Sequence, residues 1–126
     1  MARIRTVKPS FWAACGHMSR DARLLALGLI SMADDSGRFV ATQQSILGYV
    51  YPIDKDVNKD KLTRWLGEIT TKRPSADRPM IEMYRVDGVP YGWFPKYRKH
   101  QKISHPQPSY LPAPPADALF EEGEIQ

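Results

Sequence analysis

The sequence predicts an α+β fold in which a core of three helices is followed by a β-hairpin. Apolar residues recur at helical spacing in three separate segments, the pattern of helices that bury one face. Two later segments alternate apolar and polar residues on either side of Asp87-Gly88, a dipeptide typical of tight hairpin turns. The 126 residues, 42% of them apolar, suit one compact domain with tails.

The first predicted helix covers residues 20–33. Ser19 is a good N-cap, because its hydroxyl can accept a hydrogen bond from a free N–H group of the first turn. Ala22, Leu25 and Leu29 then fall on one face. The polar run that follows ends in Gly37, which suits the turn after a helix. We expect this apolar helix at the centre of the core, and a short strand at residues 38–40.

Two more helices are predicted after this strand. Thr42 caps the second, at residues 43–50, and Pro52 ends it. Asp56 caps the third, at residues 56–70, whose inward residues are spaced i, i+4 and i+7. These inward residues are Leu62, Leu66 and Ile69. The loop at residues 71–79 is basic and is long for a connection between a helix and a hairpin.

Helix, turn, helix and hairpin in this order are typical of a winged helix-turn-helix. The specific prediction is therefore a three-helix core with a C-terminal β-hairpin wing, its strands at 80–86 and 90–94. Five prolines between residues 106 and 115 predict an extended segment. Residues 1–104 are thus predicted to form a winged-helix DNA-binding domain with an N-terminal basic arm. Residues 105–126 are predicted to be a Pro-rich extended segment and an acidic tail.

The chain before this tail carries more basic than acidic residues. All 18 Lys and Arg residues lie at or before Lys102, and four of the 14 acidic residues lie after residue 116. Residues 1–116 therefore hold 18 basic and 10 acidic residues, a net charge of +8. Such an excess favours a polyanionic partner, because binding releases the counterions that condense on phosphates. Double-stranded DNA is the predicted partner, although basic surfaces also arise from solubility alone.

The predicted compartment is the cytoplasm. Cys15 is the single cysteine, so no disulfide can form within the chain, which agrees with a reducing interior. No apolar run approaches the roughly 20 residues that span a bilayer. The first residues also lack the apolar centre of a signal peptide. We therefore expect no membrane association.

Several short stretches resemble a known family. They are the opening ARIRTVKPSFW at 2–12, ARLL at 22–25 with DDSGR at 34–38, YRVDG at 84–88, and KHQKI at 99–103. These stretches are similar to phage and prophage helix-turn-helix (winged-helix) replication-initiation proteins, akin to the N-terminal domain of phage replisome organisers. The resemblance covers roughly residues 2–115. It implies a winged-helix DNA binder of a bacteriophage or prophage that acts in replication initiation or transcriptional control, in the cytoplasm of the host bacterial cell.

The third helix is the predicted recognition helix, because Lys59, Lys61 and Arg64 lie away from its apolar stripe. Arg64 suits a bidentate contact to guanine, whereas the lysines suit phosphates. The alternative is a solvated helix face. Asp60 and Glu68, expected on the same side, favour that alternative.

Two further groups of DNA-binding candidates lie outside this helix. Thr42, Gln43 and Gln44 begin the second helix, where free N–H groups and short polar side chains can hold a phosphate, although Thr42 is also an ordinary cap. Arg3 and Arg5 could follow a minor groove as a flexible arm. The apolar residues between and after these two arginines favour an arm that is tied to the core.

Four basic residues on and after the hairpin could extend a track of phosphate contacts. Arg85 is expected near the tip of the wing. Lys96, Arg98 and Lys99 follow the second strand, interleaved with aromatic residues. The alternative is a basic surface that serves solubility.

The sequence predicts neither an enzyme nor a cofactor. His17, His100 and His105 have neither the spacing nor the companion ligands of a metal site, and Cys15 beside His17 is more typical of a structural cysteine. No Gly-rich phosphate loop, nucleophile elbow or paired-carboxylate motif is present. We therefore expect a binding protein without catalytic or metal-binding residues.

An alternative function is a protein-interaction module that binds a host or phage replication or transcription protein. The acidic tail carries Leu119 and Phe120, an apolar anchor similar to the short peptides that bind the bacterial sliding clamp. Winged helices also serve as protein-binding modules. A homodimer would let two recognition helices meet successive turns of the duplex, but no sequence pattern requires one.

Overall fold

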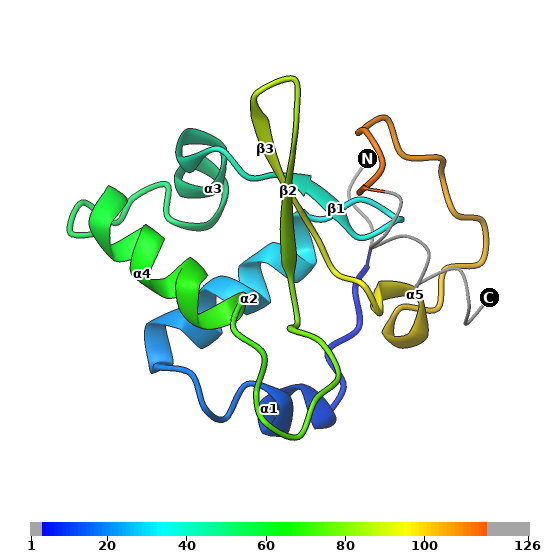
Figure 1. Ribbon diagram of the computed structural model, residues 1–126, viewed down its shortest axis with the longest axis horizontal. Coiled ribbons are helices and arrows are strands. Elements are labelled where there is room, and N and C mark those ends of the chain that lie inside the picture. Colours follow the sequence, from blue (N-terminus) through cyan, green and yellow to red (C-terminus); the bar gives the residue numbers. More distant parts are fainter. Residues whose placement is uncertain (1–3, 116–126) are drawn as a thin grey trace.

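The computed structural model of the chain describes residues 4–115. Within this range it is a small α+β structure with five helices and a three-stranded antiparallel sheet (Figure 1). The elements are α1 (Ser10–Ala14), α2 (Arg20–Met32), β1 (Arg38–Val40), α3 (Gln43–Val50), α4 (Lys59–Ile69), β2 (Glu82–Val86), β3 (Val89–Trp93) and α5 (Tyr97–His100).

The sheet has the strand order β1-β3-β2. The hairpin of β2 and β3 turns at Asp87 and Gly88, whose φ angles are 52° and 80°. Two successive residues with positive φ are typical of the type I′ turn, whose twist matches that of the strands it joins. The predicted hairpin turn at Asp87-Gly88 is therefore confirmed. β1 pairs with β3 from the other side, with Phe39 opposite Gly92.

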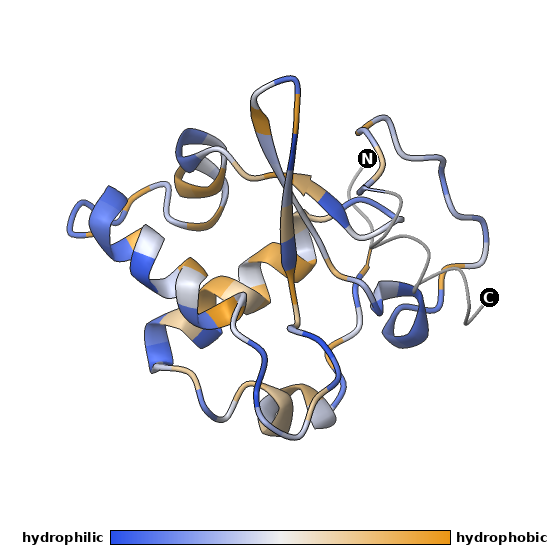
Figure 2. Cartoon of the chain, viewed as in Figure 1, coloured by the Kyte–Doolittle hydropathy of each residue, from blue (hydrophilic) through white to orange (hydrophobic). Residues whose placement is uncertain are grey.

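The centre of the core is α2, as predicted. Ser19 caps it, since its side chain accepts a hydrogen bond of 3.3 Å from the N–H of Ala22. Leu25 and Leu29 are fully buried, and α2 packs against both α3 and α4. Figure 2 shows that much of α2, which passes through the middle of the molecule, consists of hydrophobic residues.

The caps of the next two helices differ in how well the sequence predicted them. Thr42 caps α3 by accepting from the N–H of Ser45 at 3.2 Å, as expected. The predicted start of the third helix at Asp56 is wrong, because Asn58 is extended and its side chain accepts from the N–H of Lys61 at 2.9 Å. Asn is as good an N-cap as Asp, because its side-chain oxygen can likewise accept from an N–H of the first turn.

The N-terminal segment contains a short helix where an arm was expected. Pro9 stands at the N-cap of α1, a place where its missing N–H costs nothing. Phe11 is buried in the core cluster, while Trp12 is 50% exposed. The segment is therefore attached to the body through α1.

The hairpin is not C-terminal, which corrects the predicted position of the wing. After β3 the chain forms α5 and then returns over the outer face of the sheet. The Arg38 guanidinium donates to the Leu111 carbonyl at 3.0 Å, and the Tyr84 hydroxyl donates to the Pro112 carbonyl at 2.7 Å. The Pro-rich segment therefore contacts the body beyond the predicted domain end at Ser104.

Gly92 permits a close approach between β3 and the core. A Cβ atom at this position would overlap the ring of Phe39, which is 2% exposed. Any side chain at position 92 therefore has to displace Phe39 from its packed position.

We expect Gly92→Ala to lower the free energy of unfolding by about 1–3 kcal/mol, the usual cost of overpacking a core. Urea unfolding followed by tryptophan fluorescence measures it. Gly48→Ala is the matched control, because its added methyl group would meet open space. That control should be neutral or stabilising by up to about 1 kcal/mol. Equal losses in both variants would contradict the packing of Phe39.

Candidate nucleic-acid interface

The exposed face of α4 is a narrow stripe. Lys59, Thr63 and Gly67 follow one another at i, i+4 and i+8, and Arg64 lies beside them; all four are exposed. The buried face of the same helix holds Leu62 and other core residues. Because α4 has one fully buried side and one open side, Lys59 and Arg64 are both available to an external ligand, as predicted.

Lys61 lies differently from its two neighbours. Its side chain is half-buried, and its ammonium group donates to the carbonyl oxygen of Asp56 at 2.9 Å. Together with Arg64, it lines a hollow that also includes Asp21, Asp54 and Asp56. The carboxylates of this hollow face both basic residues, and Lys61 is the less exposed of the two. Lys61 therefore contributes less positive potential to the open stripe than the sequence indicated.

Glu68 does not lie on the open stripe either. Its carboxylate accepts hydrogen bonds from the N–H and the hydroxyl of Ser19, at 2.6 and 2.8 Å. A carboxylate at the N-terminus of α2 is also favoured by the helix dipole. Glu68 is thus a structural link between α4 and α2, and the expectation that it opposes DNA on the open face is wrong. Asp60 is the acidic residue of α4 that remains exposed.

The start of α3 lies beside α4. The Gln43 amide donates to the Thr63 hydroxyl at 3.4 Å, and this contact joins the two helices. Gln44 is exposed, while the Thr42 hydroxyl is occupied by its capping contacts with Ser45. Of the three candidates, Gln44 is the one whose side chain is open to a phosphate.

Arg85 lies at the tip of the hairpin, as expected. Its guanidinium donates to the carbonyl of Gly88 at 3.0 Å, and the side chain is exposed. Figure 1 shows this hairpin projecting beyond the helices. Arg85 is therefore open to an external ligand.

The basic residues after the hairpin lie elsewhere. In Figure 1, α5 is on the opposite side of the sheet from α4. Arg98 and Lys99 are exposed there, and Lys96 forms an ion pair of 2.7 Å with Asp77. The structure therefore does not bring Lys96, Arg98 and Lys99 together with the α4 stripe into one track.

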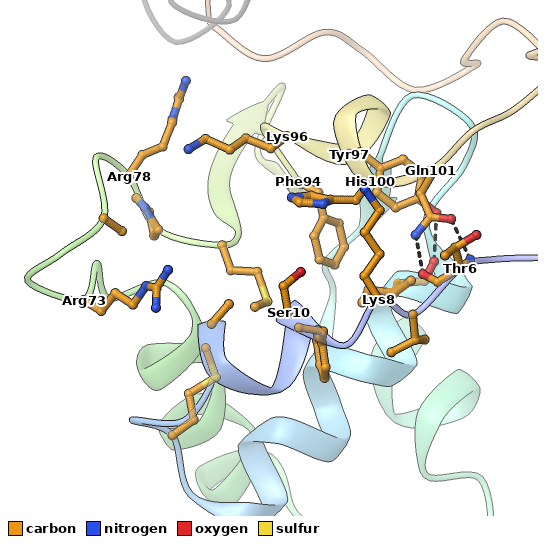
Figure 3. A pocket seen from close by; sticks show the side chains of 18 of the residues that line it. Thr6, Lys8, Ser10, Arg73, Arg78, Phe94, Lys96, Tyr97, His100 and Gln101 are labelled. Carbon is orange, nitrogen blue, oxygen red and sulfur yellow. Dashed lines mark hydrogen bonds between the residues drawn. The ribbon is translucent and has the colours of Figure 1, made fainter.

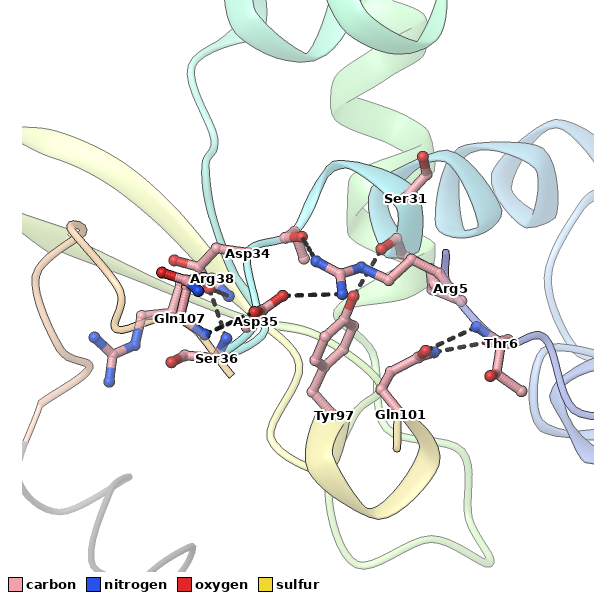
Figure 4. Close-up of polar contacts among 12 residues, drawn as sticks. Arg5, Thr6, Ser31, Asp34, Asp35, Ser36, Arg38, Tyr97, Gln101 and Gln107 are labelled. Carbon is pink, nitrogen blue, oxygen red and sulfur yellow. Dashed lines mark hydrogen bonds and ion pairs between the residues drawn. The ribbon is translucent and has the colours of Figure 1, made fainter. Parts of the chain in front are cut away.

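Arg5 is part of the body. Its guanidinium donates to the Ala33 carbonyl at 2.9 Å and forms an ion pair of 3.0 Å with Asp35 (Figure 4). It also lies over the ring of Tyr97, 5.6 Å from the centroid. Only 10% of the Arg5 side chain is exposed. Arg5 is thus unavailable to a minor groove, and Arg3 lies outside the described residues.

Around Arg5, polar groups hold the N-terminal segment against α5. The Gln101 side chain makes two hydrogen bonds to the backbone of Thr6, at 2.8 and 2.7 Å (Figure 4). The Tyr97 hydroxyl donates to the Ile30 carbonyl at 2.9 Å, and burial raises the pKa of Tyr97 to about 12. Tyr97 is therefore neutral at physiological pH. Sequence analysis treated Asp35 only as a turn residue and missed this network.

The cysteine and histidines show no arrangement for metal chemistry. Cys15 is fully buried in the core, and burial raises the pKa of its thiol. Among residues 4–115, no three His, Cys, Asp or Glu side chains are grouped so that they could hold a metal ion. No helix in that range is both long enough and apolar enough to cross a membrane.

Comparisons of this chain with protein-family models, with curated proteins and with solved structures found no match. The interface is therefore assessed on its geometry.

We expect Arg5→Ala to lower the free energy of unfolding by about 3–5 kcal/mol, because it leaves Asp35 buried without this cation. Chemical denaturation measures the loss. Arg98→Ala removes an exposed guanidinium and should change stability by no more than about 0.5 kcal/mol. An unchanged unfolding midpoint for Arg5→Ala would show that the N-terminal segment does not depend on this pair.

Proposed function

We propose that this chain binds double-stranded DNA as a winged helix-turn-helix, with α4 as the recognition helix and the β2–β3 hairpin as the wing. Two features support the proposal. The order α2-β1-α3-α4-β2-β3 supplies a helix pair followed by a hairpin, and β1 closes the sheet beside β3. The Gln43 amide also donates to the Thr63 hydroxyl at 3.4 Å, which places the start of α3 beside α4.

The observation that carries the proposal is the open stripe of α4. Lys59 is the first residue of the helix and Arg64 lies about one and a half turns later. Residues in the first turns of a recognition helix are those that contact base edges. The Arg64 guanidinium is suited to the paired acceptors of guanine, while Lys59 is suited to a phosphate. Gly67 has no side chain, and so it allows the backbone of α4 to approach a ligand closely.

Two other regions would add contacts to phosphates. Arg85 at the tip of the wing can reach the backbone of the duplex beyond α4. Gln44 at the start of α3 is exposed beside a helix N-terminus, where backbone N–H groups favour anions. These contacts position the protein but carry no sequence information.

The biological setting that we propose is initiation of phage DNA replication, or transcriptional control, in the cytoplasm of a bacterial host. It rests on the resemblance of the terminal and hairpin sequences to phage replication-initiation proteins. The geometry of α4 serves either role equally, since both require recognition of a duplex site.

A salt titration of binding to duplex fragments from the parent genome tests the proposal. We expect Lys59→Ala/Arg64→Ala to weaken specific binding by about 100-fold, since it removes one base contact and one phosphate contact. The slope of log K against log salt should fall by roughly 1–2, because fewer counterions are released.

Two controls separate this site from general basicity. Lys61→Ala removes a neighbouring cation whose ammonium group donates to the backbone carbonyl of Asp56. It should weaken DNA binding by less than fivefold, because about 1 kcal/mol or less of binding free energy is lost. Arg98→Ala/Lys99→Ala removes two exposed charges on the opposite side and should leave specificity intact. If the unmodified protein binds no duplex even at low salt, the DNA proposal is wrong and the protein-interaction alternative takes its place.

A further inference from the structure

A cavity of about 280 Å³ lies between three stretches that are distant in the sequence. They are the N-terminal segment with α1, the loop at residues 71–80, and the segment from the end of β3 through α5 (Figure 3). Its volume is close to the lower end of the range for small-molecule sites, about 300–1,000 Å³. No residue of α4 lines it, so the cavity is separate from the candidate DNA surface.

The floor of the cavity is apolar. Its largest side chains come from every stretch that forms the cavity and from α2 below it. They are Phe11, Met18, Ile30, Met80 and Phe94. Four of them are buried members of the core, and Met80 packs against that core. A ligand with an apolar body would therefore displace water from a surface that already belongs to the hydrophobic core.

The rim of the cavity is basic. We use the term basic rim for Lys8, Arg73, Arg78 and Lys96. Figure 3 shows Arg73 and Arg78 on one side and Lys8 with His100 on the other, while Ser10 and Phe94 lie between them. No Asp or Glu occurs among the described residues that line the cavity. The charged side chains at the opening of the cavity are therefore all basic.

Among the described residues, two of the four rim cations have carboxylate partners and two do not. Arg78 forms an ion pair of 2.7 Å with Glu82, and Lys96 one of 2.7 Å with Asp77. In the described part of the chain, Lys8 and Arg73 instead donate to backbone carbonyl oxygens, at 3.3 and 3.5 Å. A carbonyl carries no net charge, so the charges of Lys8 and Arg73 remain available to an anion.

The same excess of positive charge affects the pKa of His100. Its pKa is lowered, first by burial and then by repulsion from Lys8, Lys99 and Lys96. An anion bound at the rim would offset that repulsion and raise the pKa of His100.

We propose that this cavity binds an organic anion with an apolar body, of the class of aliphatic or aromatic carboxylates and sulfonates. The apolar body lies on the floor against Met80 and Phe94, and the acidic group lies within the field of the basic rim, to which Lys8 contributes from one side and Arg73 from the other. This proposal does not depend on DNA binding, because its residues come from other elements.

The test uses 8-anilinonaphthalene-1-sulfonate, a fluorescent apolar anion, and its uncharged analogue N-phenyl-1-naphthylamine. We expect the anion to bind the full chain more tightly than the analogue, and octanoate to displace it. Lys8→Gln/Arg73→Gln should weaken binding of the anion roughly tenfold and leave binding of the analogue unchanged. Ser10→Trp, which fills the cavity, should abolish binding of both probes.

The matched control is Lys59→Gln/Arg64→Gln, which removes two exposed cations from α4 and should leave binding of the anion unchanged. Near-UV circular dichroism verifies that each variant keeps its packing, since loosely packed states also bind this dye. Binding of octanoate should raise the pKa of His100, followed by proton NMR and assigned with His100→Gln.

Three results would overturn the proposal. The first is equal binding of the anion to the full chain and to Lys8→Gln/Arg73→Gln. The second is binding that persists in a folded Ser10→Trp variant, which places the probe elsewhere. The third is displacement of the probe by duplex DNA but not by octanoate, which assigns the rim to nucleic acid.

Discussion

Two adjacent carboxylates, Asp34 and Asp35, hold both ends of the described chain to the turn after α2. Asp34 accepts from the N–H groups of Ser36 and Arg38, which sets the start of β1, and it also accepts from the hydroxyl of Ser109. Asp35 pairs with Arg5 and accepts from the N–H of Gln107 at 2.8 Å. Because Asp35 is only 4% exposed, its charge requires these partners. The first and last described segments are therefore structural parts of one body.

This arrangement determines which surfaces remain open. The N-terminal segment and α5 close one side of the molecule, and residues 107–112 cover the outer face of the sheet through Arg38 and Tyr84. The stripe of α4 and the hairpin tip are exposed. Arg5 is an example. It belongs to a basic N-terminal run, but the fold buries its side chain against Asp35 and Ala33. Positive charge in the sequence thus identifies a surface only when the fold leaves that charge without an internal partner.

Local patterns predicted the elements well, while contacts between distant segments could not be predicted. Ser19, Thr42 and the Asp87-Gly88 turn act through neighbours within a few residues, so their roles can be read from the chain. Glu68 looked like an exposed residue at helical spacing, but its partner Ser19 lies 49 residues earlier. The cavity was missed for the same reason, because its rim joins residues from positions 8, 73, 78 and 96. No periodicity within one segment indicates that these cations meet.

The two open basic regions differ in a way that suits different anions. The α4 stripe is exposed and polar, and it offers the cations Lys59 and Arg64. A ligand bound there is held chiefly by charge and hydrogen bonds. Such contacts weaken steeply with salt and match a polyanion that supplies many phosphates. The cavity rim adds Lys8 and Arg73 to buried apolar surface, so a single acidic group attached to an apolar body gains from both terms. Raising the salt concentration should therefore weaken DNA binding at the α4 stripe more than binding of an apolar anion in the cavity, because salt screens charge but leaves the apolar contribution in place.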